Sequence, residues 1–570
     1  MTASHAPVVQ GLQRPLTIDA LPNELLIKIF ADVGSVSCYG NYKGIRDTRN
    51  LLPAMLTSKN WLAVICGTPA LWREILVRDS WAWLAACVHR SQDLLVDICF
   101  DSSGTNFAKA QHILRPHKDR IGSLMFRSLD CAQFGEQIAL EEMCELKSLG
   151  ITIHHGHGAD VTMHDGICPA LRALEAPFLE TLHVDGLALY KPSSPFSCLR
   201  TLQIGECVGL RKTIRIAEFV RFFNDCVSLE KLDLQHHALD AVLFDIPQGT
   251  GPISAFPRLR QLAIGGKVEE VSNLLSHMEV RPDVDLLLET DDQEDIASAA
   301  EAAWAILPRD IPGCKMGILK SATRIMVDVP PSHGPEMLFI TATQGMNLSH
   351  KINIVVRVSQ ERSAAADGTA SQHARGEYFV SALAHLARMF PDGPVETLIC
   401  RGEVSVVEER TWQTLLEGFP RLRTLVIDDN ADGHPGPLSR ALTSTACRHL
   451  EYMWLCNMYG EAADLEEIQK CVAWRTAQGA PLRRLRLDLA AKVVNGELPV
   501  VSAYQSEFAR LVPASSLILH DVKDVGRNEL PPREGVSTEP LHRVVDVLGD
   551  ELKVNEYLGR KVILPTTGTD

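Results

Sequence analysis

The stretch Leu229-Glu-Lys-Leu232-Asp-Leu234 lies near the middle of the chain and defines a motif, L-x-x-L-x-(L/I). The end of the motif alternates apolar and polar residues, which is typical of a strand with one buried face. The other copies of the motif begin at Leu146, Leu179, Leu199, Leu259, Leu422, Leu450 and Leu482. The copies that begin at 199, 229 and 259 are 30 residues apart. A regular period of this length predicts a repeated supersecondary unit.

Segments with helical spacing of apolar residues lie between several copies, for example at Ile216, Phe219 and Phe223. One strand and one helix per unit, stacked side by side, is the arrangement of leucine-rich repeats. The sequence therefore predicts an α/β fold in which 79–520 form an irregular leucine-rich-repeat-like solenoid of stacked strand–helix units. The alternative is an ordinary α/β domain whose strands begin with L-x-x-L.

Two segments interrupt this pattern, and we expect insertions near 285–345 and 361–376. The first contains the acidic run Asp291-Asp-Gln-Glu-Asp295, which leads into an alanine-rich helical pattern. The second is small and polar, which favours an insertion loop or a linker. At the two ends, we expect a flexible N-terminus over 1–17 and a cap or partly disordered tail over 521–570.

The segment 18–78 has a different, helical pattern. Apolar residues three and four positions apart follow Pro22, which is tolerated in a first helical turn. After a polar insert that reaches Asn50, a second helical pattern ends at Gly67. A helical piece of this size has little core of its own, so its apolar faces need a partner. The pattern is carried by Leu21, Pro22, Leu25, Leu26, Ile29, Phe30, Trp61, Leu71 and Trp72.

The order Leu-Pro, Glu-Leu-Leu, Ile-Phe, Trp and Leu-Trp resembles the F-box, a three-helix module. The insert between Gly34 and Asn50 departs from the family. The resemblance implies that the segment docks on the Skp-type adaptor of a cullin-type ubiquitin ligase. It also implies that the nine residues above form the docking surface, although some of them must form the core of the module instead. The repeats then resemble the irregular leucine-rich region of fungal-type F-box proteins. The alternative is that the nine residues only form the core of a helical subdomain.

The composition of the chain argues against several functions. Of the 570 residues, 46% are apolar and 22% are charged, as in soluble globular proteins. The net charge of −15 argues against a nucleic-acid partner. We expect no membrane partner, because no stretch reaches the roughly 18 apolar residues of a membrane span. The 15 cysteines contain no C-x-x-C, and the chain begins without a signal-peptide pattern, so we expect a cytoplasmic or nuclear location.

The sequence contains no recognisable catalytic or cofactor motif, such as a P-loop, G-x-G-x-x-G or H-E-x-x-H. One cluster could hold zinc, and it consists of His154, His155, His157, Asp160, His164 and Asp165. It follows a predicted strand, in a position where an exposed loop is expected. We therefore expect no enzyme activity, no cofactor and no bound metal, and an enzyme with a metal site at this cluster is the least favoured hypothesis.

The F-box resemblance and the repeats together favour the substrate-recognition adaptor of a Skp–cullin–F-box ligase. In this hypothesis the partners are the Skp-type adaptor, the cullin scaffold and a protein substrate, which the complex brings close to a ubiquitin-conjugating enzyme. The alternative is a leucine-rich-repeat interaction scaffold that is not coupled to ubiquitin transfer.

The residues between the leucines of each copy are predicted to lie on the exposed face of the sheet. Exposed Trp, Tyr and Arg side chains that lie close together are typical of binding hot spots. The predicted substrate-binding residues are Asp428, Tyr452, Trp454, Arg484 and Arg486. The alternative for Trp454 is burial under an insertion, because tryptophan is mostly buried in proteins.

Overall fold

We analysed a computed structural model of the chain. The residues that it describes are 18, 21–33, 47–78, 80–101, 107–130, 143–154, 177–185, 197–205, 214–216, 219, 223, 226–235, 238–239, 242–243, 254–292, 299–307, 316–330, 337–344, 351–358, 368–390, 393–444, 447–459, 462–491, 501–512 and 514–521. The predicted flexible N-terminus and all but the first residue of the predicted C-terminal tail lie outside them.

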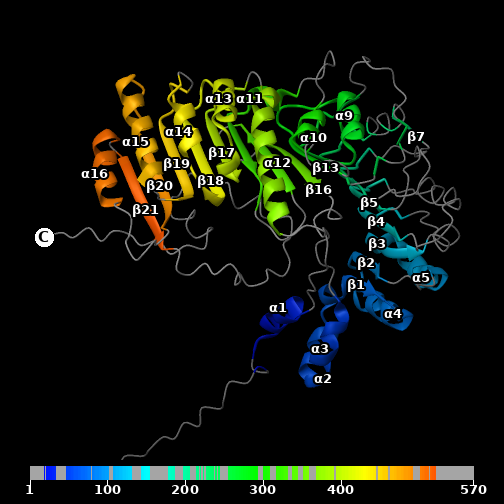
Figure 1. The fold of residues 1–570 in the computed structure, drawn as a ribbon. Coiled ribbons are helices and arrows are strands. Elements are labelled where there is room, and N and C mark those ends of the chain that lie inside the picture. The colour runs from blue at the N-terminus through cyan, green and yellow to red at the C-terminus, as the bar shows by residue number, and fades with distance from the viewer. Residues whose placement is uncertain are drawn as a thin grey trace, which may run out of the picture. The chain divides into compact units, whose positions relative to one another are not determined.

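The chain divides into two compact units, each of which we describe by itself. Unit 1 consists of Met1–Gly266, Glu270–Glu279 and Pro308–Cys314. Unit 2 consists of Lys267–Glu269, Val280–Leu307 and Lys315–Asp570. The fold is mixed α/β, with a helical N-terminal region followed by the strands of a large sheet (Figure 1). In the described parts of the chain, no helix has the length and apolar character needed to span a membrane.

Unit 1 begins with short helices whose ends are set by local hydrogen bonds. The side chain of Asp47 accepts a hydrogen bond from the backbone N–H of Arg49, and the Ser58 hydroxyl accepts one from the N–H of Asn60. Such N-terminal caps satisfy helix N–H groups that have no intrahelical acceptor. The elements are α1 (Asn23–Val33), η2 (Thr48–Leu51), α2 (Leu52–Thr57), α3 (Lys59–Cys66) and η3 (Pro69–Trp72).

Eight described strands of unit 1 pair in parallel, each with the next strand in the series. They are β1 (Glu74–Val77), β2 (Val96–Asp101), β3 (Ile121–Asp130), β4 (Ser148–His154), β5 (Thr181–Asp185), β6 (Thr201–Ile204), β8 (Lys231–Leu234) and β11 (Gln261–Gly265). The other elements are α4 (Trp81–Arg90), α5 (Phe107–Leu114), η4 (Arg115–Arg120), β7 (Ile214–Arg215), β9 (Val242–Leu243), β10 (Ser254–Ala255), α9 (Val268–Ser276) and β12 (Met278–Glu279).

Each of the eight motif copies ends in a strand. In unit 1 the second leucines of the copies are register partners across five strands, and all of them are buried: Leu149, Leu182, Leu202, Leu232 and Leu262. This column of leucines forms the core, because alternate side chains of a strand point to the same face.

The described part of unit 2 contains nine strands in the order β13, β16, β15, β14, β17, β18, β19, β20 and β21. Strand β15 runs antiparallel to both neighbours, and the other pairs are parallel. The strands are β13 (Asp285–Asp292), β14 (Arg324–Asp328), β15 (Met337–Thr343), β16 (Lys351–Val358), β17 (Thr397–Gly402), β18 (Thr424–Gly433), β19 (Tyr452–Tyr459), β20 (Arg484–Ala491) and β21 (Ala514–Asp521).

Helices of unit 2 form a layer along one side of these strands, and consecutive helices from α12 to α16 pack against each other (Figure 1). A Cβ atom added to Gly402 would lie 2.5 Å from Cδ2 of Phe379, so α12 packs directly on β17 at this glycine. The helical elements are α10 (Ala299–Ala305), α11 (Gly317–Ser321), α12 (Gly368–Met389), η8 (Val404–Val406), α13 (Glu409–Gly418), α14 (Gly436–Leu442), α15 (Ala462–Ala477) and α16 (Val501–Leu511).

The two segments predicted to be insertions contribute regular structure to unit 2. Within 285–345, strands β13, β14 and β15 pair with other strands of the sheet. Their apolar runs, such as Ile325-Met-Val327, favour buried strands but lack the L-x-x-L spacing used to find the repeats. Within 361–376, helix α12 begins at Gly368, so the small polar residues after that position belong to a helix.

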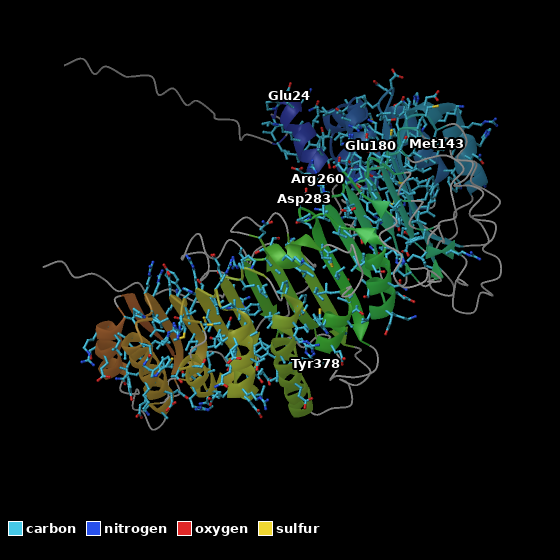
Figure 2. All side chains as sticks on the ribbon, turned by 90° about the horizontal axis from the view of Figure 1, so that it is seen from above. Glu24, Met143, Glu180, Arg260, Asp283 and Tyr378 are labelled. Atoms are coloured by element: carbon cyan, nitrogen blue, oxygen red, sulfur yellow. The ribbon has the colours of Figure 1, made fainter. Side chains whose placement is uncertain are left out.

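An alternating ladder of charges precedes the strands in both units. In each unit, every ladder residue after the first donates its backbone N–H to the carbonyl oxygen of the preceding member. In unit 1 the ladder is Lys147, Glu180, Arg200, Glu230 and Arg260, and in unit 2 it is Glu396, Arg423, Glu451 and Arg483. Figure 2 labels two of these residues, Glu180 and Arg260.

The sign of the charge changes at every step of this ladder. Ion pairs join Arg200 to Glu230 at 3.8 Å and Arg483 to Glu451 at 3.3 Å. Exposed pairs like these add little stability, but like charges on neighbouring strands repel each other. The ladder therefore disfavours pairings in which a strand skips its neighbour in the series, because two like charges would then lie side by side. The signal lies in the second position of each motif copy, which the L-x-x-L-x-(L/I) pattern leaves unspecified.

Candidate functional site

Helix α1 divides its apolar residues between two faces. Leu26 and Phe30 are buried, with 0% and 2% of their surface exposed. Leu25, Ile29 and Val33 remain 45%, 38% and 48% exposed. The three exposed residues are four positions apart, so they form one stripe along the helix. The i, i+4 spacing of Leu25, Leu26, Ile29 and Phe30 by itself predicts a single apolar face, whereas the structure separates these residues into core and surface.

The aromatic residues of the segment close its core. Trp72 is fully buried and donates its Nε1–H to the Ile65 carbonyl at 2.8 Å. The half-buried Trp61 packs edge to face on Phe30, with ring centroids 5.3 Å apart. Leu71 is also buried. Of the predicted adaptor-binding residues, therefore, Leu26, Phe30, Leu71 and Trp72 form the core, Pro22, Leu25 and Ile29 are exposed, and Leu21 and Trp61 are half-buried.

Three more exposed leucines lie on the neighbouring helices. Leu52 and Leu56 of α2 are one turn apart, and Leu56 is 86% exposed, while Leu62 is exposed on α3. Single exposed apolar residues are ordinary, but a concentration of them marks an interaction site. We call these residues the aliphatic set: Leu25, Ile29, Val33, Leu52, Leu56 and Leu62. The i, i+4 spacing of Leu52 and Leu56 could have identified the part on α2 from sequence.

The helical segment is joined to the sheet of unit 1 by side-chain contacts. The indole Nε1–H of Trp83 on α4 donates to the Thr48 hydroxyl at 3.1 Å, and the Trp72 and Trp83 rings are 5.7 Å apart. The Arg90 guanidinium lies over the Trp72 ring at 4.6 Å. Because α4 also packs on β1, these contacts make the helical segment continuous with the first strand–helix pair.

The thiol of Cys87 on α4 lies in the same contact region, between α4 and η2. Its sulfur lies 3.7 Å from the Thr48 hydroxyl. Burial raises the pKa of Cys87 to about 11, although the contact with Thr48 opposes this shift. At neutral pH the thiol is therefore protonated and acts as a packing group, not as a nucleophile.

Comparison with known families agrees with this architecture, because the model of the F-box-like family matches residues 18–78. Residues 18–78 are an F-box-like domain. The matched residues coincide with the boundaries expected from sequence. A search of the curated proteins found no match to the chain. The F-box-like domain thus carries both the aliphatic set and the buried core around Trp72.

A second candidate surface lies on the unit 2 sheet, on the face opposite to the one where Gly402 contacts α12. Met326, Ile399, Val426 and Trp454 are successive register partners on β14, β17, β18 and β19. The first three side chains form a buried apolar cluster, and the half-buried ring of Trp454 packs against it. Trp454 is therefore anchored in this face, with part of the ring accessible.

The charges nearest to Trp454 come from β20. The Arg486 guanidinium lies over the Trp454 ring at 4.3 Å, and the indole Nε1–H donates to Asp488 Oδ2 at 3.0 Å. Arg486 Nε donates to Asp488 Oδ1 at 3.1 Å. Asp488 is only 2% exposed, so both of its oxygens are satisfied inside the sheet face. Stacking and hydrogen bonding together hold the Trp454 ring in one orientation.

Asp428 lies at the centre of a second polar cluster. It accepts a hydrogen bond from Asn457 Nδ2 at 2.6 Å and lies 3.5 Å from Arg401 Nε. Asn457 has a φ of 57°, in the left-handed region that asparagine tolerates, and the β19–β20 register shifts at this point. Such a bulge turns the Asn457 side chain towards Asp428.

Asp328 lies beside the same cluster. Burial raises the pKa of Asp328 to about 6, the charge of Arg401 lowers it, and the charge of Asp428 raises it. The carboxyl is therefore mostly ionised at neutral pH but takes up a proton at mildly acidic pH.

The structure brings together three of the predicted substrate-binding residues, Asp428, Trp454 and Arg486, in one sheet face. Tyr452, which is 39% exposed, and Arg484, also exposed, lie one row away as register partners of each other. The substrate-binding residues predicted from sequence do not include Asp328, Arg401, Asn457 or Asp488. Strand alternation points to Asp488, but Asp328 and Arg401 belong to strands that lack the L-x-x-L-x-(L/I) motif.

The histidine cluster falls almost wholly outside the described residues. Strand β4 ends at His154, and the other five residues of the cluster follow it in the chain. Within the described ranges, no group of three or more His, Cys, Asp and Glu side chains could hold a metal ion.

Proposed function

We propose that the chain is the substrate-recognition adaptor of a Skp–cullin–F-box ubiquitin ligase. The F-box-like domain supports an adaptor role in general. In our proposal, the aliphatic set docks on a Skp-type adaptor, a cullin scaffold joins through that adaptor, and unit 2 holds a substrate protein. The single observation that carries the proposal is the division of α1, in which Leu25, Ile29 and Val33 stay exposed while Leu26 and Phe30 form the core.

The exposed side chains of the aliphatic set are suited to an interface with a stably bound partner. Full burial of one aliphatic side chain contributes roughly 1.5–3 kcal/mol, so a partner that covers several of them gains substantial affinity. Interfaces of this apolar kind are typical of obligate complexes. The buried residues Phe30 and Trp72 then act indirectly, by holding α1 and α3 in place behind the docking surface.

The strand–helix units fit the second half of the proposal. We propose that they form an irregular leucine-rich-repeat-like stack of the fungal F-box type, which presents the residues between the leucines to a substrate. The chain then acts without chemistry of its own, by raising the local concentration of substrate beside a ubiquitin-conjugating enzyme. A cytoplasmic or nuclear location, with no cofactor, is part of this proposal.

The test is co-purification of the full chain with a Skp-type adaptor and a cullin. The test variant, Leu25→Asp/Ile29→Asp, places two charges in the proposed apolar interface and should reduce adaptor capture by about tenfold or more. The matched control is Phe178→Asp/Val227→Asp, which changes two apolar residues outside the F-box-like domain that are somewhat more exposed than Leu25 and Ile29. Circular dichroism checks that both variants fold.

The outcomes separate the hypotheses. Capture of both partners by wild type and by the control, but not by the test variant, supports the ligase adaptor. Capture of the Skp-type adaptor without cullin favours an interaction scaffold that is not coupled to ubiquitin transfer. Failure of folded wild type to capture either partner overturns the proposal.

A further inference from the structure

Strand β14 presents a cation, an apolar side chain and a carboxylate in line on the sheet face that carries Trp454, which we call the Trp454 face. They are Arg324, Met326 and Asp328, which alternate with fully buried core residues of the same strand. Arg324 and Asp328 are half-buried, whereas Met326 keeps 7% of its surface exposed. Four residues of a strand span about 13 Å, so the two charges lie at the ends of one short apolar stretch.

The guanidinium of Arg324 has no counter-charge among the residues that the structure describes, and it makes no hydrogen bond with them. Burial lowers the pKa of Arg324, and the like charge of Arg401 lowers it further. The register partner of Arg324 on β15 is the buried Thr343, whose hydroxyl also has no hydrogen-bond partner in the described part of the chain. An anion beside Arg324 would therefore offset both its burial and the repulsion from Arg401.

The carboxylate of Asp328, at the other end of the stretch, has no cation of its own. Within the described ranges it makes no hydrogen bond or ion pair, and its register partner Arg401 lies 3.5 Å from Asp428 instead. Burial raises the pKa of Asp328 to about 6, the charge of Arg401 opposes this shift only in part, and the charge of Asp428 adds to it. Two carboxylates thus share the guanidinium of Arg401, and a further cation beside Asp328 would be favourable.

The centre of the stretch is apolar and continues across the sheet. Met326 packs with Ile399 and Val426 in the cluster described above, and each of the three side chains keeps 7–8% of its surface exposed. The helices of unit 2 cover the opposite face of these strands, where Gly402 contacts α12. An apolar side chain of a partner that lies over Met326 would therefore contact this cluster and become buried against it.

We propose that the Trp454 face binds, along β14, an extended segment of a substrate protein with an acidic, an apolar and a basic residue at alternate positions. This inference rests on the proposed function, because it names the class of segment that unit 2 would hold. Alternate side chains of an extended segment share one face and are about 7 Å apart, as they are on β14 itself. The acidic residue then lies beside Arg324, the apolar residue over Met326 and the basic residue beside Asp328.

The two charges of β14 select against other occupants. A segment with two acidic residues would bring one of them beside Asp328, and a segment with two basic residues would bring one beside Arg324, so like charges would meet. A wholly apolar segment would cover both charges without supplying a counter-charge, which is unfavourable. Charge complementarity therefore requires one charge of each sign, four positions apart. Either order along the segment fits, because a segment can lie parallel or antiparallel to β14.

The experiment selects peptides from a displayed library of random twelve-residue sequences on the immobilised full-length chain. More often than in the unselected library, peptides selected by wild type should contain an acidic and a basic residue four positions apart, with an apolar residue midway. Arg324→Gln and Asp328→Asn should each weaken binding of these peptides about tenfold in fluorescence anisotropy titrations. Asp328→Asn removes a carboxylate whose burial is unfavourable, so this variant should lose affinity without losing stability.

A double-mutant cycle between peptide and chain identifies which charges meet. Changing the acidic peptide residue to Gln should weaken binding to wild type about tenfold but should not weaken binding to Arg324→Gln further. The basic peptide residue should show the same coupling with Asp328→Asn. The matched controls, Arg410→Gln and Glu417→Gln, remove the same charges at exposed positions of α13 and should leave the affinity unchanged.

Three results would overturn the inference: no selected peptides, selected peptides without the paired charges of opposite sign, or no coupling in the cycle between a peptide charge and the folded variants. Capture of a Skp-type adaptor by the same preparations is measured separately. A chain that captures the adaptor but selects no peptides of this pattern contradicts only the inference. A chain that selects such peptides but captures no adaptor contradicts only the proposed function.

Discussion

The sheets of unit 1 and unit 2 are built on the same motif but carry different residues between their leucines. In unit 1 the central row of the face contains Met125, Gly150, His183, Gln203 and Asp233 as successive partners. In unit 2 the corresponding positions hold Trp454 and Arg486, with Asp488 beyond them. The leucines determine where the strands lie, whereas the positions between them are free to differ. Function is therefore to be sought in those positions and not in the motif.

The two faces also bury titratable groups of opposite kinds. Burial lowers the pKa of His183 to about 4, and a side-chain hydrogen bond with Gln203 opposes this shift. Burial raises the pKa of Asp328 to about 6. In both cases the neutral form is favoured, but one group is a base and the other an acid. The stability of the two units should consequently respond to pH in opposite directions below pH 6.

The largest expected effect is the loss of the buried carboxylate in unit 2. Asp488→Ala removes the acceptor of both Arg486 and the Trp454 indole, and it leaves a mostly buried guanidinium without its partner. We expect unit 2 to lose about 3–5 kcal/mol of stability, the usual cost of breaking a buried ion pair from one side. Hydrogen exchange of the β19 and β20 amides, measured by mass spectrometry, checks this result.

The same experiment contains its own control in unit 1. Amides of β5 and β6 should exchange at the wild-type rate, because Asp488 contacts only residues of unit 2 in the hydrogen bonds described above. Faster exchange in both units would mean that the chain unfolds as a whole. Unchanged exchange in β20 would show that the pair between Arg486 and Asp488 contributes no stability.

The second prediction concerns His183. Its folded pKa lies below the ordinary 6.5, so the unfolded chain binds more protons between pH 4 and 6.5. The stability of unit 1 should therefore rise with pH across that window and level off above it, by at most about 3 kcal/mol. His183→Leu should flatten this rise in urea unfolding curves measured at pH 4.5 and 7. A rise of equal size in the variant would assign it to other groups.

The third prediction concerns Asp328, for which the sign is reversed. Its folded pKa lies above the ordinary 3.8, so the folded chain binds more protons between pH 4 and 6. The stability of unit 2 should fall as pH rises through that window. Asp328→Asn should remove this fall and raise the stability at pH 7, by less than about 3 kcal/mol because Arg401 loses a favourable charge. Hydrogen exchange of β14 at pH 5 and 7 provides the measurement, and a destabilised Asn variant at pH 7 contradicts the argument.

Sequence reasoning located the parts of the molecule that depend on local patterns. The F-box-like boundaries and the strands that follow Leu229, Leu450 and the other copies were predictable, because apolar spacing determines them. The division of α1 into core and surface was not predictable, since Leu25 and Leu26 are equally apolar and only tertiary packing distinguishes them. Strand β14 was missed for a related reason: it supplies Arg324 and Asp328 to the sheet face but belongs to no motif copy.

The smallest expected effect is the response of the F-box-like domain of unit 1 to salt. The aliphatic set consists of uncharged side chains, so capture of a Skp-type adaptor should change little between 50 and 300 mM sodium chloride. Capture by one preparation, measured at both salt concentrations, checks this result. A several-fold loss of capture at the higher concentration would mean that charged side chains carry much of the interaction, because salt screens exposed charges.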